Sequence, residues 1–167
     1  MKYCYNCSAL LQKEPPTNCS QCGTEHWKNP RCCAGALIIK GDELLLVRRL
    51  SPPWAGFWDI PGGYCEAYEH PEVCASREAL EETGVSIQIQ SYHGIWLDTD
   101  SNLLYGSNIC IYYIAEPIGD YSMIPDGKET DKVRWFKLNC LPEKIAFSNH
   151  IPDVLKKLSE TLEPTFR

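Results

Sequence analysis

The sequence predicts a domain of mixed α and β structure, of the α+β or α/β class, preceded by a small cysteine-rich unit. Residues 1–30 are polar, rich in cysteine and poor in aliphatic residues, and the composition changes from Cys33 onward. Between residues 34 and 137, short apolar runs recur with the spacing of strands, whereas two other segments have helical character. We therefore expect one unit at residues 1–30 and a second domain at residues 31–167.

The elements of the larger domain follow from these patterns. Apolar runs predict five strands, over residues 34–39, 44–47, 85–89, 108–115 and 132–137. The first two are expected to form a hairpin, and residues 61–63 a tight turn. Residues 71–83 predict a helix that Gly84 is placed to cap, and residues 151–162 predict a closing amphipathic helix with its aliphatic side chains on one face.

Composition and charge limit the possible functions. No apolar run approaches the roughly 20 residues that a membrane span needs, and the first residues lack the apolar core of a signal peptide. We therefore expect a soluble, cytoplasmic protein without a membrane partner. The formal net charge of −6 argues against a nucleic-acid duplex as partner, because such proteins present basic surfaces. A small anionic substrate remains compatible, provided that arginines or metal ions supply local positive charge.

Four of the ten cysteines, Cys4, Cys7, Cys19 and Cys22, form the pattern CxxC-x11-CxxC. Zn²⁺ takes four thiolates in a tetrahedron, and each CxxC turn places two sulfurs on one side of an ion. A closed sphere of four cysteines predicts a structural zinc ribbon, whose metal offsets the lack of a hydrophobic core. Two disulfides, four free thiols or an iron ion are the alternatives.

The remaining six cysteines are scattered through apolar stretches, where we expect buried free thiols in a reducing compartment. They are Cys32, Cys33, Cys65, Cys74, Cys110 and Cys140.

The helix over residues 71–83 carries an unfavourable charge pattern. Glu78, Glu81 and Glu82 stand at i, i+3 and i+4, so their carboxylates share one face. Mutual repulsion and the helix dipole near Gly84 together cost roughly 1–2 kcal/mol. A local conflict of this kind often marks function, and clustered carboxylates suit Mg²⁺ or Mn²⁺. An ordinary solvated helix face is the alternative.

The same segment resembles the signature of a known family. Residues 63–85 match the Nudix box, G-x5-E-x7-R-E-U-x-E-E-x-G-U with U aliphatic. Identities fall at all seven fixed positions: Gly63, Glu69, Arg77, Glu78, Glu81, Glu82 and Gly84. Ala79 is small for its aliphatic position. The resemblance covers about residues 33–160 and implies the Nudix α/β/α sandwich, with a mixed sheet between helices.

The resemblance also implies roles for individual residues. Glu78, Glu81 and Glu82 correspond to ligands of catalytic Mg²⁺ or Mn²⁺, together with the Gly62 carbonyl. Glu69 and Arg77 correspond to a charge pair that fixes the loop on the helix. The metal ions would bridge a diphosphate and lower the pKa of a bound water.

Further site residues are expected outside the box. The general base varies in this family, and Glu129, just before the strand over residues 132–137, is our candidate besides the box glutamates. Of Arg48 and Arg49, alternation turns only one toward the site, and we favour Arg48. Trp54, Phe57 and Trp96 are candidates for stacking on a nucleobase; packing under loops is the alternative for each.

The ribbon narrows the choice of substrate. A Cys4 ribbon before a Nudix domain resembles NADH pyrophosphatases and a group of ADP-ribose and FAD pyrophosphatases. The former carry an SQPWPFPxS-like array, which residues 101–107 lack. We therefore expect cleavage of ADP-ribose or FAD to AMP and a phosphorylated product. Activity on oxidised dNTPs or NADH, or nucleotide sensing without hydrolysis, are the alternatives. We also expect the ribbon to act in a homodimer or at the substrate entrance.

Overall fold

The computed structural model describes residues 2–99 and 106–162. It divides into two compact units, residues 1–30 and residues 31–167. Of the segment 101–107, on which the comparison with NADH pyrophosphatases depends, residues 101–105 lie outside the described part. Within the described ranges, no helix is long and apolar enough to cross a membrane.

The first unit consists of turns and one small ladder. Strand β1 (Thr17–Asn18) pairs antiparallel with β2 (Glu25–His26). Each CxxC segment forms a turn: the amide of Ser8 donates to the carbonyl of Cys4, and the amide of Gly23 donates to that of Cys19. Gly23 has a φ of 73°, which a glycine adopts without strain.

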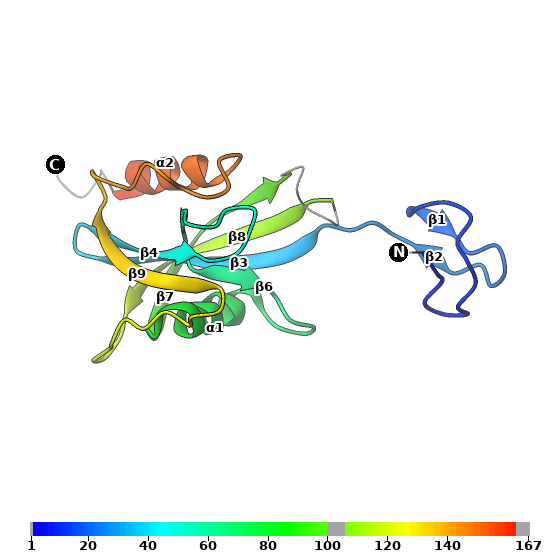
Figure 1. Ribbon diagram of the computed structural model, residues 1–167, viewed down its shortest axis with the longest axis horizontal. Coiled ribbons are helices and arrows are strands. Elements are labelled where there is room, and N and C mark those ends of the chain that lie inside the picture. The colour runs from blue at the N-terminus through cyan, green and yellow to red at the C-terminus, as the bar shows by residue number, and fades with distance from the viewer. Residues whose placement is uncertain (1, 100–105, 163–167) are drawn as a thin grey trace. The chain divides into compact units, whose positions relative to one another are not determined.

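The second unit is built on one seven-stranded sheet (Figure 1). Its strands are β3 (Arg31–Lys40), β4 (Glu43–Arg49), β5 (Trp58–Asp59), β6 (Gly62–Tyr64), β7 (Ile87–Asp98), β8 (Asn108–Pro117) and β9 (Thr130–Lys137). The central path runs β5-β4-β3-β8-β7, while β6 pairs with β3 and β9 pairs with β4. Among the ladders of the described residues only β3–β8 is parallel, so the sheet is mixed, as the family resemblance implied.

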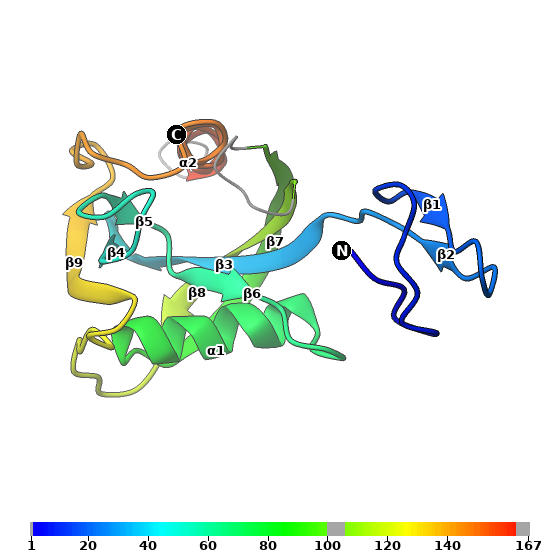
Figure 2. The ribbon, with the colours of Figure 1, turned by 45° about the vertical axis from the view of Figure 1, so that its right-hand side comes forward.

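Two helices cover the two faces of this sheet: α1 (Pro71–Thr83) lies on one side and α2 (Ile151–Leu162) on the other (Figure 2). Alternate residues of β3 feed two cores. Ala36 and Ile38 pack in the cluster that contains α1, whereas Leu37 packs with α2. Because both faces are covered, every residue from Leu44 to Val47 is at most 1% exposed. The predicted sandwich is therefore confirmed.

Both helices match their predicted bounds. His70 accepts a hydrogen bond from the amide of Glu72 and Pro71 opens α1, two features of a helix start. Gly84 ends α1 in the left-handed region, with its amide bonded to the carbonyl of Leu80. In α2, the predicted apolar face buries Ile151, Val154 and Leu158.

Three expectations differ from the structure. Residues 62–64 form strand β6 on β3 rather than a tight turn at residues 61–63, because their backbone groups find partners in β3. The strand expected over residues 85–89 extends as β7 to Asp98, since β8 offers a long pairing edge. The six scattered cysteines are not all buried: Cys74 and Cys110 are, but Cys32 and Cys140 are exposed.

Candidate active site

A cavity of about 520 Å³ opens beside the β3–β6 ladder and the C-terminal half of α1, where Arg77, Glu78 and Glu81 line it. Six carboxylates and two arginines line it: Asp59, Glu66, Glu78, Glu81, Asp98, Glu129, Arg49 and Arg77. Among the residues that the structure describes, no lysine lines it. The negative charge of this wall opposes an anionic substrate unless cations accompany it.

The two glycines before the Nudix-like helix let the loop approach the sheet and the glutamates closely. An ideal Cβ on Gly62 would lie 2.6 Å from the carbonyl oxygen of Ala34. One on Gly63 would lie 2.5 Å from Oε1 of Glu78. The carboxylate of Glu78 therefore rests against the backbone of this loop, which also lines the cavity. The amide of Gly62 donates to Oε2 of Glu82 at 2.9 Å, which joins the loop to α1.

Arg77 organises the other carboxylates. It forms a bidentate pair with Glu69 at 2.8 and 2.9 Å, and this pair lowers the pKa of Glu69 to about 2. This is the charge pair between loop and helix that the box predicts. Its Nη1 also bonds Glu78 at 2.7 Å and Glu81 at 3.2 Å. One guanidinium thus partly offsets the repulsion predicted among the helix carboxylates.

The three box glutamates differ in their environments. The side chain of Glu81 is 59% exposed, whereas Glu82 is buried and is not among the lining residues. Burial raises the pKa of Glu78, and burial raises that of Glu82 to about 9. A metal site needs several ligand atoms of His, Cys, Asp or Glu close together. Among the residues that the structure describes, only the four ribbon cysteines bring three or more of these atoms within 4.8 Å of one another. The glutamates share the helix face that their spacing predicts but do not converge to that degree.

Glu129 lies at the same cavity, on a loop held by its own hydrogen bonds. Asp126 accepts from the amides of Lys128, Glu129 and Thr130. The carbonyl of Glu129 accepts from the amide of Leu50 at 2.7 Å. The repulsion between Glu129 and the box carboxylates contributes to the raised pKa values of Glu78 and Glu82, which reflects their proximity.

Of the two adjacent arginines at the end of β4, Arg49 lines the cavity, whereas Arg48 pairs with Asp131 outside it. The β4–β9 ladder shifts register between these arginines, from the pair Arg48–Lys132 to the pair Arg49–Thr130, so that Asp131 is the extra residue of a bulge. Arg49 bonds the buried Asp59 at 2.9 Å. Its guanidinium lies 4.9 Å from the ring centre of Phe147, another lining residue.

The three aromatic candidates do not line the cavity. Trp54 packs edge-on against Phe57, with ring centres 5.2 Å apart, and also contacts Phe147. Trp96 stacks on His93 and packs within the core beneath α2. Packing is thus the structural role of all three. The aromatic residues that line the cavity are instead Tyr64, Tyr112 and Phe147.

Another part of the cavity wall is formed by residues that sequence analysis did not name as site residues. They come from the ends of β7 and β8 and from the start of α2, and they include Asp98, Asn108, Tyr112 and His150. The only sequence signal for them is the position of polar residues at strand ends and before a helix. That signal is shared with many ordinary loops.

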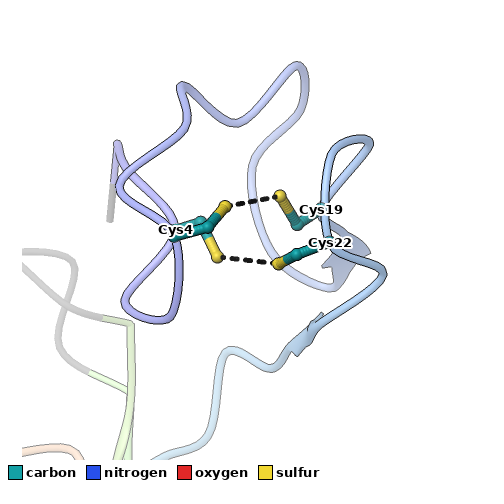
Figure 3. A group of neighbouring side chains, drawn as sticks. Cys4, Cys19 and Cys22 are labelled. Carbon is teal, nitrogen blue, oxygen red and sulfur yellow. Dashed lines mark hydrogen bonds between the residues drawn. The ribbon is translucent and has the colours of Figure 1, made fainter.

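In the first unit the sulfurs of the four ribbon cysteines lie within 4.8 Å of one another, and Figure 3 shows Cys4, Cys19 and Cys22 of this group. The sulfurs of Cys4 and Cys22 are 3.6 Å apart, as are those of Cys7 and Cys19. A tetrahedron of thiolates around Zn²⁺ at about 2.3 Å has edges of about 3.8 Å, so the spacing fits the ion. Hydrogen bonding from Thr24 lowers the pKa of Cys22 to about 5, which favours the thiolate that a metal binds.

Fold and cavity together define an α/β/α sandwich whose acidic site lies between a glycine loop and a glutamate helix. The chain belongs to the Nudix family, because the model of the NUDIX domain matches residues 29–158. The Nudix hydrolase from Nitrosomonas europaea has a solved structure that superposes with a TM-score of 0.83 at 28% identity, over 98% of this chain and 93% of that one.

Two curated relatives differ in what they are named for. An NAD-capped RNA hydrolase of Pseudomonas aeruginosa is 29% identical over 98% of this chain, but the match spans 59% of the relative's length. An ADP-ribose pyrophosphatase of Methanocaldococcus jannaschii is 31% identical over 72% of this chain and 69% of the relative. Because the first relative's name includes an RNA, that comparison does not support the expectation of no nucleic-acid partner.

Proposed function

We propose that this chain is a metal-dependent pyrophosphohydrolase that cleaves the diphosphate of a nucleoside diphosphate derivative. ADP-ribose or FAD is the expected substrate, and AMP and a phosphorylated product are the expected products. The observation that carries this proposal is the cavity wall of six carboxylates against two arginines, next to an intact Nudix box. Such a wall binds a diphosphate only with divalent cations, which carboxylates and backbone carbonyls hold well.

The residues present fit Mg²⁺ or Mn²⁺. The carboxylate of Glu78 rests on the glycine loop, so carboxylate and carbonyl oxygens are available on one side of the cavity. Glu78, Glu81, Glu82 and the Gly62 carbonyl are the proposed ligands. Bound there, the metal would offset phosphate charge and lower the pKa of a bound water. Arg77 holds Glu78 and Glu81 on the same face, and its pair with Glu69 keeps the loop in place.

Arg49 is the proposed contact to a phosphate oxygen. Its pair with Asp59 and its stacking on Phe147 hold the guanidinium at the cavity wall. An arginine fixed in this way presents its remaining donors without losing further rotamer freedom. This assigns to Arg49 the role that the sequence had favoured for Arg48.

Glu129 is the proposed general base. Its side chain belongs to the cavity wall that Glu78 and Glu81 also form, and the Asp126 turn fixes its backbone. A carboxylate held next to the metal-binding face is in place to take a proton from an attacking water.

We further propose that Zn²⁺ occupies the cysteine quartet as a structural ion. Between residues 2 and 30 only Cys4, Cys19 and His26 are buried, so side-chain packing alone provides little stability there. Four thiolates leave no open coordination position for chemistry.

Two relatives support different substrates. The ADP-ribose pyrophosphatase supports our first choice, and the NAD-capped RNA hydrolase, whose match includes the ribbon, favours an NAD or NADH diphosphate as the second candidate. Oxidised dNTPs remain the third.

The test is turnover of a substrate panel with Mg²⁺ or Mn²⁺. The panel contains ADP-ribose, FAD, NAD, NADH, diadenosine polyphosphates and 8-oxo-dGTP, and products are separated by chromatography. Release of AMP from ADP-ribose or FAD, lost in a Glu82→Gln variant, is the expected result. Pyrophosphate release from 8-oxo-dGTP alone would contradict the dinucleotide assignment. Tight nucleotide binding without turnover of any compound would favour a sensor.

A further inference from the structure

Two thiols lie opposite each other at the start of the Nudix box. Cys32 is on β3, and Cys65 directly follows β6. The register of the β3–β6 ladder places them one step beyond the pair Cys33–Tyr64. The amide of Cys65 donates to the carbonyl of Cys32 at 3.0 Å, so the pairing continues to this point. Their sulfur atoms are 3.6 Å apart.

The backbone at this pair suits a disulfide. Antiparallel residues that share backbone hydrogen bonds have Cα atoms about 5.5 Å apart, within the range of about 4.4–6.8 Å that disulfides span. To form the bond, the sulfurs must close from 3.6 Å to about 2.0 Å. Cys32 is also paired with Ile109 of β8, whereas Cys65 begins the loop to α1. The loop side is therefore the side that yields.

The pair differs from the ribbon cysteines in its surroundings. Among the described residues, only the ribbon gathers three or more ligand atoms within 4.8 Å, so Cys32 and Cys65 lack the further ligands of a thiolate metal site. Cys32 is exposed and Cys65 is half-buried, so a small reagent in solvent can reach them. Cys74 of α1, which also contacts Cys65, is fully buried. The two accessible thiols therefore form a pair rather than a metal cage.

Cys65 lies among the hydrogen bonds that hold the loop on the glutamate helix. The carbonyl of Tyr64, the residue before it, accepts from Nη2 of Arg77 at 3.2 Å. The amide of Glu66, the residue after it, donates to the carboxylate of Glu69 at 2.8 Å. Arg77 also bonds two of the proposed metal ligands. A displacement of Cys65 toward β3 therefore acts on the guanidinium that positions these ligands.

We propose that Cys32 and Cys65 are a reversible thiol modification site, which low-molecular-weight disulfides oxidise to a protein disulfide, and that this bond weakens metal binding at the neighbouring glutamates. The second half of this inference rests on the proposed function, because it requires the metal site.

The reaction is thiol–disulfide exchange in two steps. One of the two sulfurs, as its thiolate, attacks the small disulfide, whose S–S bond breaks and releases one small thiolate. The other protein sulfur loses its proton, attacks the mixed disulfide and releases the second small thiolate. The two protein thiols are oxidised, the small disulfide is reduced, and the two protons that leave the protein thiols pass through solvent to the released thiolates.

The experiment treats the reduced protein with oxidised glutathione at about pH 8. Burial and the hydrogen bond with Cys65 raise the pKa of Cys32 to about 11, so a mildly alkaline buffer increases its thiolate fraction. Free thiols are then blocked, and mass spectrometry follows tryptic peptides 32–40 and 50–77, which contain the two cysteines. The Mn²⁺ affinity of the reduced and oxidised proteins is measured by electron paramagnetic resonance.

The variants are Cys32→Ser, Cys65→Ser and the control Cys140→Ser. Cys140 is exposed like Cys32 but lies in the turn after β9. In Cys32→Ser every other thiol, including those of the ribbon, meets the same oxidant. The difference between this variant and the wild type therefore isolates the pair.

In the wild type and Cys140→Ser we expect linked peptides and an Mn²⁺ affinity weaker by about threefold to tenfold, the worth of about one hydrogen bond. Dithiothreitol should reverse both changes, and neither should occur in Cys32→Ser or Cys65→Ser. No link in the wild type, or a link that persists in either of these two variants, would overturn the disulfide. A link that leaves Mn²⁺ affinity unchanged would overturn its coupling to the site. No Mn²⁺ binding by the reduced wild type would reject the proposed metal site and the coupling, while linked peptides would still establish the disulfide.

Discussion

Replacement of Gly63 by alanine tests whether the position of Glu78 matters for the proposed chemistry. The backbone of Gly63 does not have a positive φ, so alanine adopts it without strain. Its Cβ, however, would lie 2.5 Å from Oε1 and 2.6 Å from Cδ of Glu78. Ordinary contacts between such atoms are about 3.5–4.0 Å, so the carboxylate must move by about 1 Å.

The cost of that movement falls on activity more than on stability. A carboxylate at the end of a flexible side chain can yield, so we expect a change in unfolding free energy of less than about 1 kcal/mol. A misplacement of 1 Å in a catalytic group costs about 100-fold. We therefore expect kcat/KM for AMP release to fall about 100-fold at saturating Mg²⁺, and Mn²⁺ affinity to weaken in parallel.

Gly62→Ala is the matched control. Its Cβ would lie 2.6 Å from the carbonyl oxygen of Ala34 and from the Cα of Gly35, which are backbone atoms that cannot rotate away. We expect a loss of stability of about 1–3 kcal/mol, or a Tm lower by several degrees in a domain of this size. Wild-type kcat/KM in Gly63→Ala, or a loss of Tm equal to that of Gly62→Ala, would refute the reasoning.

Three further predictions follow from the site and the ribbon. Glu129→Gln should lower kcat at least tenfold with an unchanged Tm, and a near-wild-type rate would remove this residue from the mechanism. Glu69→Gln should lower stability at pH 7 by about 1–3 kcal/mol, because it breaks a bidentate, charge-assisted pair between two half-buried side chains. Arg77 lowers the pKa of Glu69 from its ordinary 4.5 to about 2. The stability that the pair contributes is therefore present above pH 4.5 and is lost as the pH falls from 4.5 toward 2. A Glu69→Gln variant whose Tm depends on pH below 4.5 in the same way as that of the wild type would contradict this. Cys19→Ser should abolish zinc binding, measured by metal analysis, and should expose the amides of residues 2–30 to hydrogen exchange. The Tm of the larger domain should not fall. Zinc retained at wild-type stoichiometry would argue against the site.

Much of the fold could be predicted because it depends on local patterns. The bounds of α1 follow from Pro71 and Gly84, which act on the helix ends directly. The apolar face of α2 follows from spacing alone, since residues one helical turn apart meet the same neighbour. The approach of the ribbon cysteines was likewise predictable, because two short turns set the position of each pair of sulfurs.

The pairing of strands and the direction of side chains could not be predicted in the same way. Gly62 to Tyr64 form a strand only because β3 lies beside them. In β4, Leu44 to Val47 are buried on both faces, so hydrophobic alternation carries no signal about which arginine at its end turns toward the cavity. Asp131 forms a bulge on β9, a strand some 80 residues away in the sequence. Arg48 forms an ion pair with Asp131, whereas Arg49 lines the cavity.

The sequence by itself therefore determined the family, the glutamate face and the cysteine quartet, since each is encoded at short fixed spacings. The tertiary structure alone decided which further polar residues line the cavity. Asp98 lies on β7, Tyr112 on β8 and His150 just before α2, and the hydrogen bonds in this region join residues up to 51 positions apart. Such a wall has no local signature, because its hydrogen bonds form only when the chain has folded and each polar group has found its partner.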